Sequence, residues 1–360
     1  MTTKITVKHM DSAISEAKKG AGYTKTNPLV GCILVKKGKV IAKGHHARYG
    51  MEHAESMALK IAGRKAAGAT AFVTMEPCVG FYGKKTPPCS ERLVEAGVEK
   101  VVIGMRDPNP KVSGKGIKFL REHGVKVEES GKEKQCSEIN RPYLKCVKKG
   151  LPLVVIKAAI TLDGNIAAWG GDSKWISSKE SRRAVHELRT RHDAVLVGRK
   201  TVSADNPELN VRHVKGRDPL RVIVDGGLKI SLKTKVAVKG TIIAVSEAVS
   251  EKKKAGFIKK GVLFLKVRRK GRGLDLKDLL SKLPALGVSS VLVEGGSGII
   301  TSLLKEKLAD KIILFVAPKL CGSGVSLTGN LGIRKMNNAI QLKDVKYYLT
   351  GVDVVVEGNL

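Results

Sequence analysis

Three pieces of sequence indicate the fold of the first part of this chain: GMEHAESMALKIAG (residues 50–63), ATAFVTMEPC (residues 69–78) and TPPC (residues 86–89). The apolar spacing of the first piece predicts a helix that opens at His53. The second piece reads as a strand that ends at its Glu-Pro-Cys, and Cys89 is predicted to open the next helix. Metal-binding side chains therefore stand at the ends of three neighbouring elements.

This arrangement favours a zinc-dependent deaminase. His53, Cys78 and Cys89 have the types and number of ligands that a catalytic zinc uses while one position stays open for water. Removing an amino group from a heteroaromatic ring also needs a carboxylate that does not bind the metal and moves the proton, and Glu55 suits that role. His-Ala-Glu alone is a weak signal, and a cysteine after a strand is most often a small core residue. The combination favours zinc, whereas Cys32, inside the apolar VGCILV, is interpreted as core.

Strands and helices alternate on both sides of this stretch, which predicts layered α/β structure. The polar segment 145–153, with Gly and Pro close together, is expected to be a linker, and we predict domains at 1–148 and 149–360. In the first domain we expect helices at 8–20, 53–63, 89–98 and 116–124, and strands at 30–35, 40–46, 69–77, 100–105 and 125–129. In the second we expect strands at 153–160, 193–198, 219–226, 240–246, 289–296, 310–320 and 352–358, and helices at 180–191 and 298–309.

Charge is the unusual feature of the composition. The chain of 360 residues carries 66 Lys and Arg against 33 Asp and Glu, and the net charge of +33 is spread over both halves. Such a surface attracts anionic metabolites and phosphates. No arginine-rich stripe or aromatic platform accompanies the charge, so we expect a solvated surface that binds nucleic acid at most non-specifically.

Several classes of protein are disfavoured by the sequence. No apolar run is long enough for a transmembrane helix, and the first residues have no apolar signal core, so we expect no membrane association. The six cysteines are scattered and do not suggest a disulfide scaffold. We therefore expect a cytoplasmic protein.

The chain resembles the family of bifunctional riboflavin-biosynthesis deaminase–reductases. The resemblance covers nearly the whole chain, in order. Besides the zinc motifs it rests on TNPLVGC (26–32), MRDPNP (105–110), KAAITLDG (157–164), DSKWIS (172–177), ADNP (204–207), VEGG (293–296) and APKL (317–320).

This resemblance implies an α/β protein with two parts, a cytidine-deaminase-like three-layer domain and a dihydrofolate-reductase-like α/β domain. It implies zinc-dependent hydrolytic deamination of 2,5-diamino-6-(5-phosphoribosylamino)pyrimidin-4-one, then NADPH-dependent reduction of the ribosyl group to ribityl. It also implies a homo-oligomer, a dimer or tetramer formed through the reductase domain.

The resemblance also implies roles for individual residues. Lys157 and Glu294 are expected at the reacting sugar, as catalytic residues. The expected substrate contacts are Asn27, Asp107, Asn109, Ser173, Arg189, Leu209, Arg212 and Glu294. The expected NADPH contacts are Ala159, Trp175, Thr201, Asp205, Gly296, Ser297, Gly298, Ile299, Ile300, Thr301 and Ser302.

Simpler interpretations stay open for some of these residues. Asp107 and Asn109 suit a turn by composition alone. Arg189 could lie on a helix surface, Trp175 could be a core residue, and Asp205 could cap a helix. His45 and His46 could form a pair in the pocket, although solvated histidines at a strand end are the simpler interpretation.

One segment departs from the family pattern. The ten residues Val79–Pro88 form a longer loop than the family usually has between the cysteines, and they lack its Ser-His pair. Because loop insertions cost little free energy, zinc binding should survive. Lys84 or Lys85 in this loop could meet the substrate phosphate, although solvated lysines are the simpler interpretation. Two alternative functions remain: a reductase with a relic deaminase domain, and an RNA-binding or RNA-editing deaminase.

Overall fold

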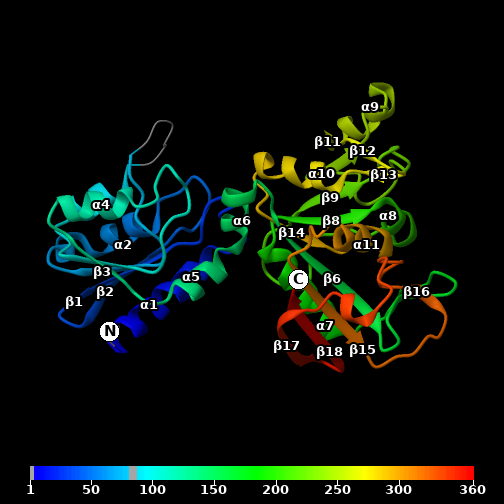
Figure 1. Ribbon diagram of the computed structural model, residues 1–360. Helices are drawn as coiled ribbons and strands as arrows, with labels where there is room; N and C mark the ends of the chain where they lie inside the picture. Colours follow the sequence, from blue (N-terminus) through cyan, green and yellow to red (C-terminus); the bar gives the residue numbers. More distant parts are fainter. Residues whose placement is uncertain (1–3, 81–86) are drawn as a thin grey trace. The chain divides into compact units, whose positions relative to one another are not determined.

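The computed structural model describes residues 4–80 and 87–360, and it divides into two compact units that meet between Gly150 and Leu151 (Figure 1). This division lies two residues after the one predicted from the sequence. Lys145–Lys149 are the last turn of helix α6 (Arg141–Lys149) and not a linker. The helix ends at Gly150, which adopts the left-handed φ of 65° that glycine tolerates best.

The first unit is built on a five-stranded mixed sheet. The order is β2 (Lys39–His45), β1 (Gly31–Lys36), β3 (Thr70–Val73), β4 (Lys100–Ile103) and β5 (Lys126–Glu129). Strand β1 runs antiparallel to both of its neighbours, whereas β3, β4 and β5 are parallel. Parallel strands place the ends of β3 and β4 at one edge, where Cys78 follows β3 and Asp107 and Asn109 follow β4.

Helices cover both faces of this sheet and make three layers. Cys32 and Leu34 of β1 pack in one apolar cluster, and Ile33 and Val35, pointing the opposite way, pack in another. The first cluster is closed by α2 (Ala54–Ala62), α3 (Cys89–Glu95) and α4 (Lys115–Glu122). The second is closed by α1 (Lys4–Ala17), α5 (Glu133–Ile139) and α6. The predicted three-layer domain is confirmed.

The second unit contains a nine-stranded sheet. Its order is β11 (Leu263–Lys266), β10 (Thr241–Val245), β9 (Leu220–Val224), β8 (Ala194–Gly198), β14 (Ser290–Val293), β6 (Leu153–Thr161), β15 (Lys311–Ala317), β18 (Asp353–Asn359) and β17 (Lys343–Thr350). The strands from β11 to β15 are parallel, and β18 is antiparallel to both β15 and β17. Two small pairs complete the strands: β7 (Asn165–Ala168) with β16 (Gly324–Ser326), and β12 (Arg269–Lys270) with β13 (Gly273–Leu274).

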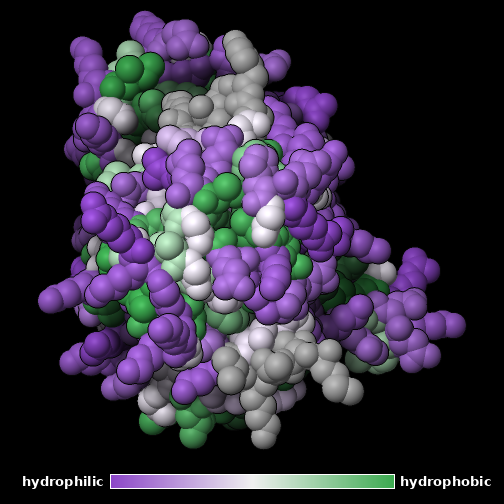
Figure 2. All heavy atoms as spheres, turned by 90° about the vertical axis from the view of Figure 1, so that its left-hand side faces the viewer, coloured by the Kyte–Doolittle hydropathy of each residue, from purple (hydrophilic) through white to green (hydrophobic). Residues whose placement is uncertain are grey.

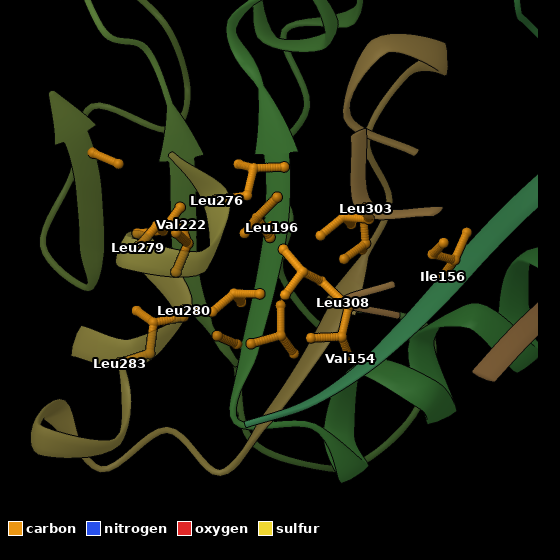
Figure 3. Close-up of a cluster of buried hydrophobic side chains, with 14 of the residues drawn as sticks. Val154, Ile156, Leu196, Val222, Leu276, Leu279, Leu280, Leu283, Leu303 and Leu308 are labelled. Carbon is orange, nitrogen blue, oxygen red and sulfur yellow. The ribbon is translucent and has the colours of Figure 1, made fainter. Parts of the chain in front are cut away.

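Two apolar clusters hold helices against this sheet. One cluster packs α10 (Leu276–Lys282) and α11 (Ser297–Lys305) on Val154 and Ile156 of β6 (Figure 3). The other involves α7 (Lys179–Arg191), α8 (Arg199–Asp205) and α9 (Glu251–Lys259) and includes Val155. Because side chains alternate along a strand, Lys157 faces the same side as Val155, towards α7. Each fully buried leucine here contributes roughly 1.5–3 kcal/mol.

The surface is polar over most of the face drawn in Figure 2, where apolar side chains form only small, separate areas. Among the described helices, none is both long and apolar enough to cross a membrane.

Candidate active sites

His53, Cys78 and Cys89 come together in the first unit. His53 precedes α2 in an extended conformation, and Cys89 is the first residue of α3. The Nδ1 atom of His53 lies 3.4 Å from Sγ of Cys78 and 3.3 Å from Sγ of Cys89. Zinc bonds of about 2.3 Å to sulfur and about 2.0–2.1 Å to nitrogen would place tetrahedral ligand atoms at nearly these separations. The three residues therefore fit a zinc ion.

The unusual loop between the cysteines does not separate them. The backbone N–H and the hydroxyl of Ser90 both donate to the carbonyl of Cys78, at 3.2 and 3.1 Å. This places the start of α3 directly beside Cys78. Lys84, Lys85 and Thr86 of the loop lie outside the described residues.

Glu55 occupies the first turn of α2, only 3 % exposed. Burial raises the pKa of its carboxyl, and the charge of Cys78 adds to the rise, while His53 and a hydrogen bond with Cys89 oppose it. A carboxyl in this position can hold and release a proton beside the metal ligands. Cys32 is fully buried in the core, as expected, and burial raises the pKa of its thiol.

His46 lies at this site, in agreement with the less favoured of the two interpretations that the sequence allowed. It is 3 % exposed, and its Nδ1 lies 3.0 Å from the carbonyl of Glu52. Its Nε2 lies 3.2 Å from Nδ2 of Asn27, and its ring meets that of His53 edge-on at 5.4 Å. The interpretation of His46 as a solvated histidine is therefore wrong. Its position just after β2 gave the only signal, because that edge of the sheet faces the start of α2.

Asp107 and Asn109 form a tightly bonded turn beside this site. The Oδ1 atom of Asp107 accepts from the N–H of Asn109 at 2.9 Å and from the hydroxyl of Tyr143 at 2.7 Å. Oδ1 of Asn109 accepts from the N–H of Lys111 at 3.0 Å. Burial, the larger effect, raises the pKa of Asp107 despite these hydrogen bonds. The turn interpretation thus describes the observed bonding, and Asp107 shapes the loop.

Three of the residues expected at the reductase site lie together in the second unit. Arg189 is buried and does not lie on the helix surface. It donates two hydrogen bonds to Glu294, from Nε to Oε1 at 2.7 Å and from Nη2 to Oε2 at 2.8 Å. Its Nη1 donates to the carbonyl of Asn210 at 2.8 Å. The guanidinium is therefore engaged by protein groups. Lys157 of β6 lies near enough to this pair for its pKa to depend on their charges.

The charges of this group are coupled. Burial alone would raise the pKa of Glu294, but the charge and hydrogen bonds of Arg189, helped by Lys157, hold it at about 2. Burial lowers the pKa of the Lys157 ammonium, Glu294 opposes this change and Arg189 adds to it. Glu294 is thus a carboxylate at neutral pH, and the Lys157 ammonium loses its proton more easily than that of an ordinary lysine.

A basic hollow of about 760 Å³ lies between α7 and the segment 212–215. Its lining residues are Arg183, Glu187, Thr190, Arg191, Arg212, His213, Val214 and Lys215. The N–H of Arg212 donates to Nδ1 of the buried His186 at 3.2 Å. Burial, then the charges of Arg189 and Arg212, lower the pKa of His186 to about 4, so its imidazole stays neutral.

Other expected substrate and cofactor residues bond to one another. The hydroxyl of Ser173 donates to Asp205 at 3.1 Å, and the N–H of Gly296 donates to Oγ1 of Thr201 at 3.2 Å. The side chain of Leu209 is 2 % exposed and belongs to the core.

The expected cofactor residues differ in accessibility. Trp175 is 64 % exposed, with the Arg182 guanidinium 4.5 Å from its ring centre, so the core interpretation is wrong. Ile300 is fully buried, and Thr301 and Ser302 donate to helix carbonyls at 2.6 and 2.9 Å. A Cβ added at Gly298 would meet nothing within 4 Å, so the start of α11 is open to a ligand.

Comparison with known proteins gives matches to both units. Residues 3–105 match the family described as cytidine and deoxycytidylate deaminase zinc-binding region, and residues 152–356 match the RibD C-terminal domain. The riboflavin biosynthesis protein RibD of Aquifex aeolicus is 41% identical over 358 residues, covering 99% of both chains.

Two solved structures are similar over almost the whole chain. Acinetobacter baumannii RibD, form 1, has a TM-score of 0.90 at 35% identity, covering 99% of both chains. A diaminohydroxyphosphoribosylaminopyrimidine deaminase/5-amino-6-(5-phosphoribosylamino)uracil reductase from Thermotoga maritima has a TM-score of 0.86 at 36% identity, covering 99% of this chain and 98% of that one.

Proposed function

The chain belongs to the RibD family of riboflavin biosynthesis, in which a deaminase and a reductase are joined, and we propose how its own residues carry out the two reactions. The first is hydrolysis of the 2-amino group of 2,5-diamino-6-(5-phosphoribosylamino)pyrimidin-4-one. The second is reduction of the ribosyl group of the deaminated product to ribityl. The single observation that carries the proposal is that reactive side chains lie together in each unit, around His53 in the first and around Glu294 in the second.

In the deaminase, His53, Cys78 and Cys89 hold the zinc ion. When bound, zinc supplies the Lewis acidity that lets a coordinated water ionise near neutral pH. Glu55 accepts the proton from the attacking water and delivers it to the amino group that leaves as ammonia. Its burial keeps bulk water away from this proton transfer, and its raised pKa suits a group that must both accept and donate. Asn27, oriented by His46, contacts the pyrimidine or the ribose.

In the reductase, Lys157 and Glu294 act on the sugar. NADPH, when bound, supplies the hydride that C1′ takes up. Lys157 gives a proton to the ring oxygen as its bond to C1′ breaks, and the lowered pKa of the ammonium favours this transfer. Glu294 stays ionised and stabilises positive charge at C1′ and its nitrogen. Arg189, already bonded to the Glu294 carboxylate, orients that carboxylate.

The start of α11 fits a dinucleotide phosphate. Gly296 precedes the helix in an extended conformation, and Gly298 leaves open space above the first turn. N–H groups at a helix start attract phosphates. We therefore assign NADPH to this loop, with Ala159, Trp175, Thr201 and Asp205 beside it. Ile300 supports the loop from the core.

The substrate phosphate is assigned to the basic hollow beside α7. Arg212 lines this hollow and reaches His186, one helical turn before Arg189. Arg212 is half-exposed, and its guanidinium lies 2.9 Å from Asn210 Oδ1 and 3.6 Å from the half-exposed Glu208 carboxylate, so part of it faces the hollow. Ser173 completes the expected substrate contacts, and Leu209 supports the site from the core.

Assembly and location complete the proposal. We expect a dimer or tetramer formed through the second unit, where β17 is an edge strand with exposed Tyr347 and Leu349. Light scattering of the purified chain tests this. We propose a cytoplasmic location, because the six cysteines are scattered through the chain and do not suggest a disulfide scaffold. Nucleic acid binding, if measured, should be lost as salt rises.

Purified protein given the diamino substrate and NADPH tests the function, with ammonia and NADPH followed separately. We expect ammonia release followed by NADPH oxidation. NADPH oxidation on the deaminated compound without any ammonia release from the diamino compound would support the relic-deaminase alternative instead.

A further inference from the structure

Glu76 is a buried carboxylate with no role in the chemistry described above. It follows β3 and precedes Pro77 and the zinc ligand Cys78, and it is 3 % exposed. Its Oε2 accepts from the N–H of Asp107 at 3.3 Å and from that of Gly114 at 3.0 Å. Its Oε1 accepts from the N–H groups of Gly116 and Ile117, at 3.0 and 3.2 Å. One side chain thus binds four backbone donors.

All four donors belong to the segment 107–117. This segment contains the Asp107–Asn109 turn and the first turn of α4, which Glu76 caps. The approach is close, because a Cβ added at Gly116 would lie 2.0 Å from the carbonyl oxygen of Pro77. The start of α4 is therefore pressed against the residue that joins Glu76 to Cys78.

Tyr143 holds the same turn from the opposite layer of the unit. Its hydroxyl donates to Oδ1 of Asp107 at 2.7 Å, while the backbone N–H of Asp107 donates to Glu76. Tyr143 lies in α6 and packs in the apolar cluster of α1 and α5. The turn is thus fixed by two side chains from separate parts of the unit. The charges of Glu76 and Cys78 both act on the Asp107 carboxyl, so the turn lies close to the metal ligands.

We propose that Glu76 is a positioning residue of the deaminase, which fixes the Asp107–Asn109 turn beside the zinc ligands as one wall of the pyrimidine pocket. The proposal rests on the proposed deaminase function. Glu76 itself does not touch substrate or metal in this account. Its two oxygens act on the pocket through four backbone bonds.

The substitution Glu76→Gln probes this role with little change in volume. The amide keeps one accepting oxygen but turns an N–H group towards two backbone donors, so about half of the bonds are lost. A displaced wall weakens substrate binding more than the zinc chemistry. We expect KM for the diamino substrate to rise about tenfold and kcat to change less than about threefold. Zinc content should stay unchanged.

The chain carries its own folding control, because reductase activity on the deaminated substrate reports on the second unit and zinc content reports on the first. Glu128→Gln is the matched substitution, since Glu128 is exposed on β5, where its carboxylate pairs with the Lys100 side chain at 2.7 Å. It should leave both KM and kcat unchanged.

Tyr143→Phe provides a second, milder variant. It removes one hydroxyl from the same turn, and we expect KM to rise about threefold. Because both side chains hold one turn, the double variant should raise KM by less than the product of the single effects.

Distinct outcomes would overturn the proposal. Zinc loss in proportion to lost activity would mean that Glu76 supports Cys78 instead of the turn. An unchanged KM in Glu76→Gln, or fully independent effects of the two substitutions, would also contradict it. If Glu76→Gln misfolds and lowers both activities, Tyr143→Phe becomes the test. An unchanged KM in Tyr143→Phe would then be enough to contradict the proposal. Wild-type protein that releases no ammonia would instead refute the deaminase function itself.

Discussion

The two active sites are organised differently. In the first unit, His53, Cys78 and Cys89 converge on one point and Glu55 stands beside them, so the roles follow from the residue types. In the second unit, Arg189 and Glu294 satisfy each other's charge, and Ser173 pairs with Asp205. A role there depends on partners far away in the sequence. The difference predicts that the first site depends mainly on single groups, and the second on coupled pairs.

The largest expected effect is that of Glu55→Gln on the first site. Because Glu55 carries the proton in both halves of the hydrolysis, ammonia release should fall by about 10²–10⁴-fold. Reduction of the deaminated substrate should be unchanged. Glu52→Gln, at an exposed position just before His53, is the control and should behave as wild type. An ammonia assay in which both variants match wild type would refute the role of Glu55.

Removal of zinc by a chelator should separate the two sites almost as strongly. Ammonia release should disappear and return when zinc is added, and the first unit should melt at a lower temperature because bound ligand stabilises the folded state. Reductase activity should persist. Equal loss of both activities would show that the second site depends on the metal.

Arg189→Gln tests the coupled pair of the second site. Losing the guanidinium leaves the Glu294 carboxylate buried and unpaired, which typically costs about 3–5 kcal/mol of unfolding free energy. We expect reductase kcat/KM to fall about 100-fold, since Glu294 loses its orientation. Arg269→Gln, an exposed position on β12, serves as control. Unfolding in denaturant and NADPH oxidation measure the two effects, and wild-type values for both would contradict the coupling.

The smallest effect concerns stability in acid. The pKa of Glu294 is about 2 in the folded chain, below its ordinary value of 4.5, so its carboxylate stabilises the fold above about pH 4.5. That stability, about 3 kcal/mol by linkage, is lost as the pH falls from 4.5 towards 2. Denaturant unfolding of the second unit should show this loss, and Arg189→Gln should show less of it. If the unfolding free energy of Arg189→Gln fell more steeply in acid than that of wild type, Arg189 would not be the cause of the low pKa of Glu294.

The sequence predicted the first site well because its motifs are local. His53 and Glu55 lie within one helix start, and Cys89 begins another, so residue types and element ends were enough. Glu76 was missed and His46 was placed at the site only as the less favoured interpretation, since their roles come from contacts with Glu52, Asn27 and the segment 107–117 that no spacing displays.

The second unit was predicted less completely. The buried strands were recognised, but β17 was not, because KDVKYYLT is a polar edge strand with little alternation. At the end of the first unit, the last turn of helix α6 was interpreted as a linker because its lysines dominate the apolar signal of Tyr143 and Leu144. Arg189 could be selected among four neighbouring arginines only through the resemblance. Its bond to Glu294, 105 residues away, required the fold.

One chain thus holds two independent chemistries that act in sequence. The decisive measurement follows ammonia and NADPH together for wild type, Glu55→Gln and Lys157→Gln, all given the diamino substrate. Wild type should consume NADPH only after ammonia appears. Glu55→Gln should release no ammonia, and it should oxidise NADPH only after the deaminated compound is added. Lys157→Gln should release ammonia without oxidising NADPH. NADPH oxidation by Glu55→Gln at the wild-type rate, or loss of ammonia release in Lys157→Gln, would contradict the account.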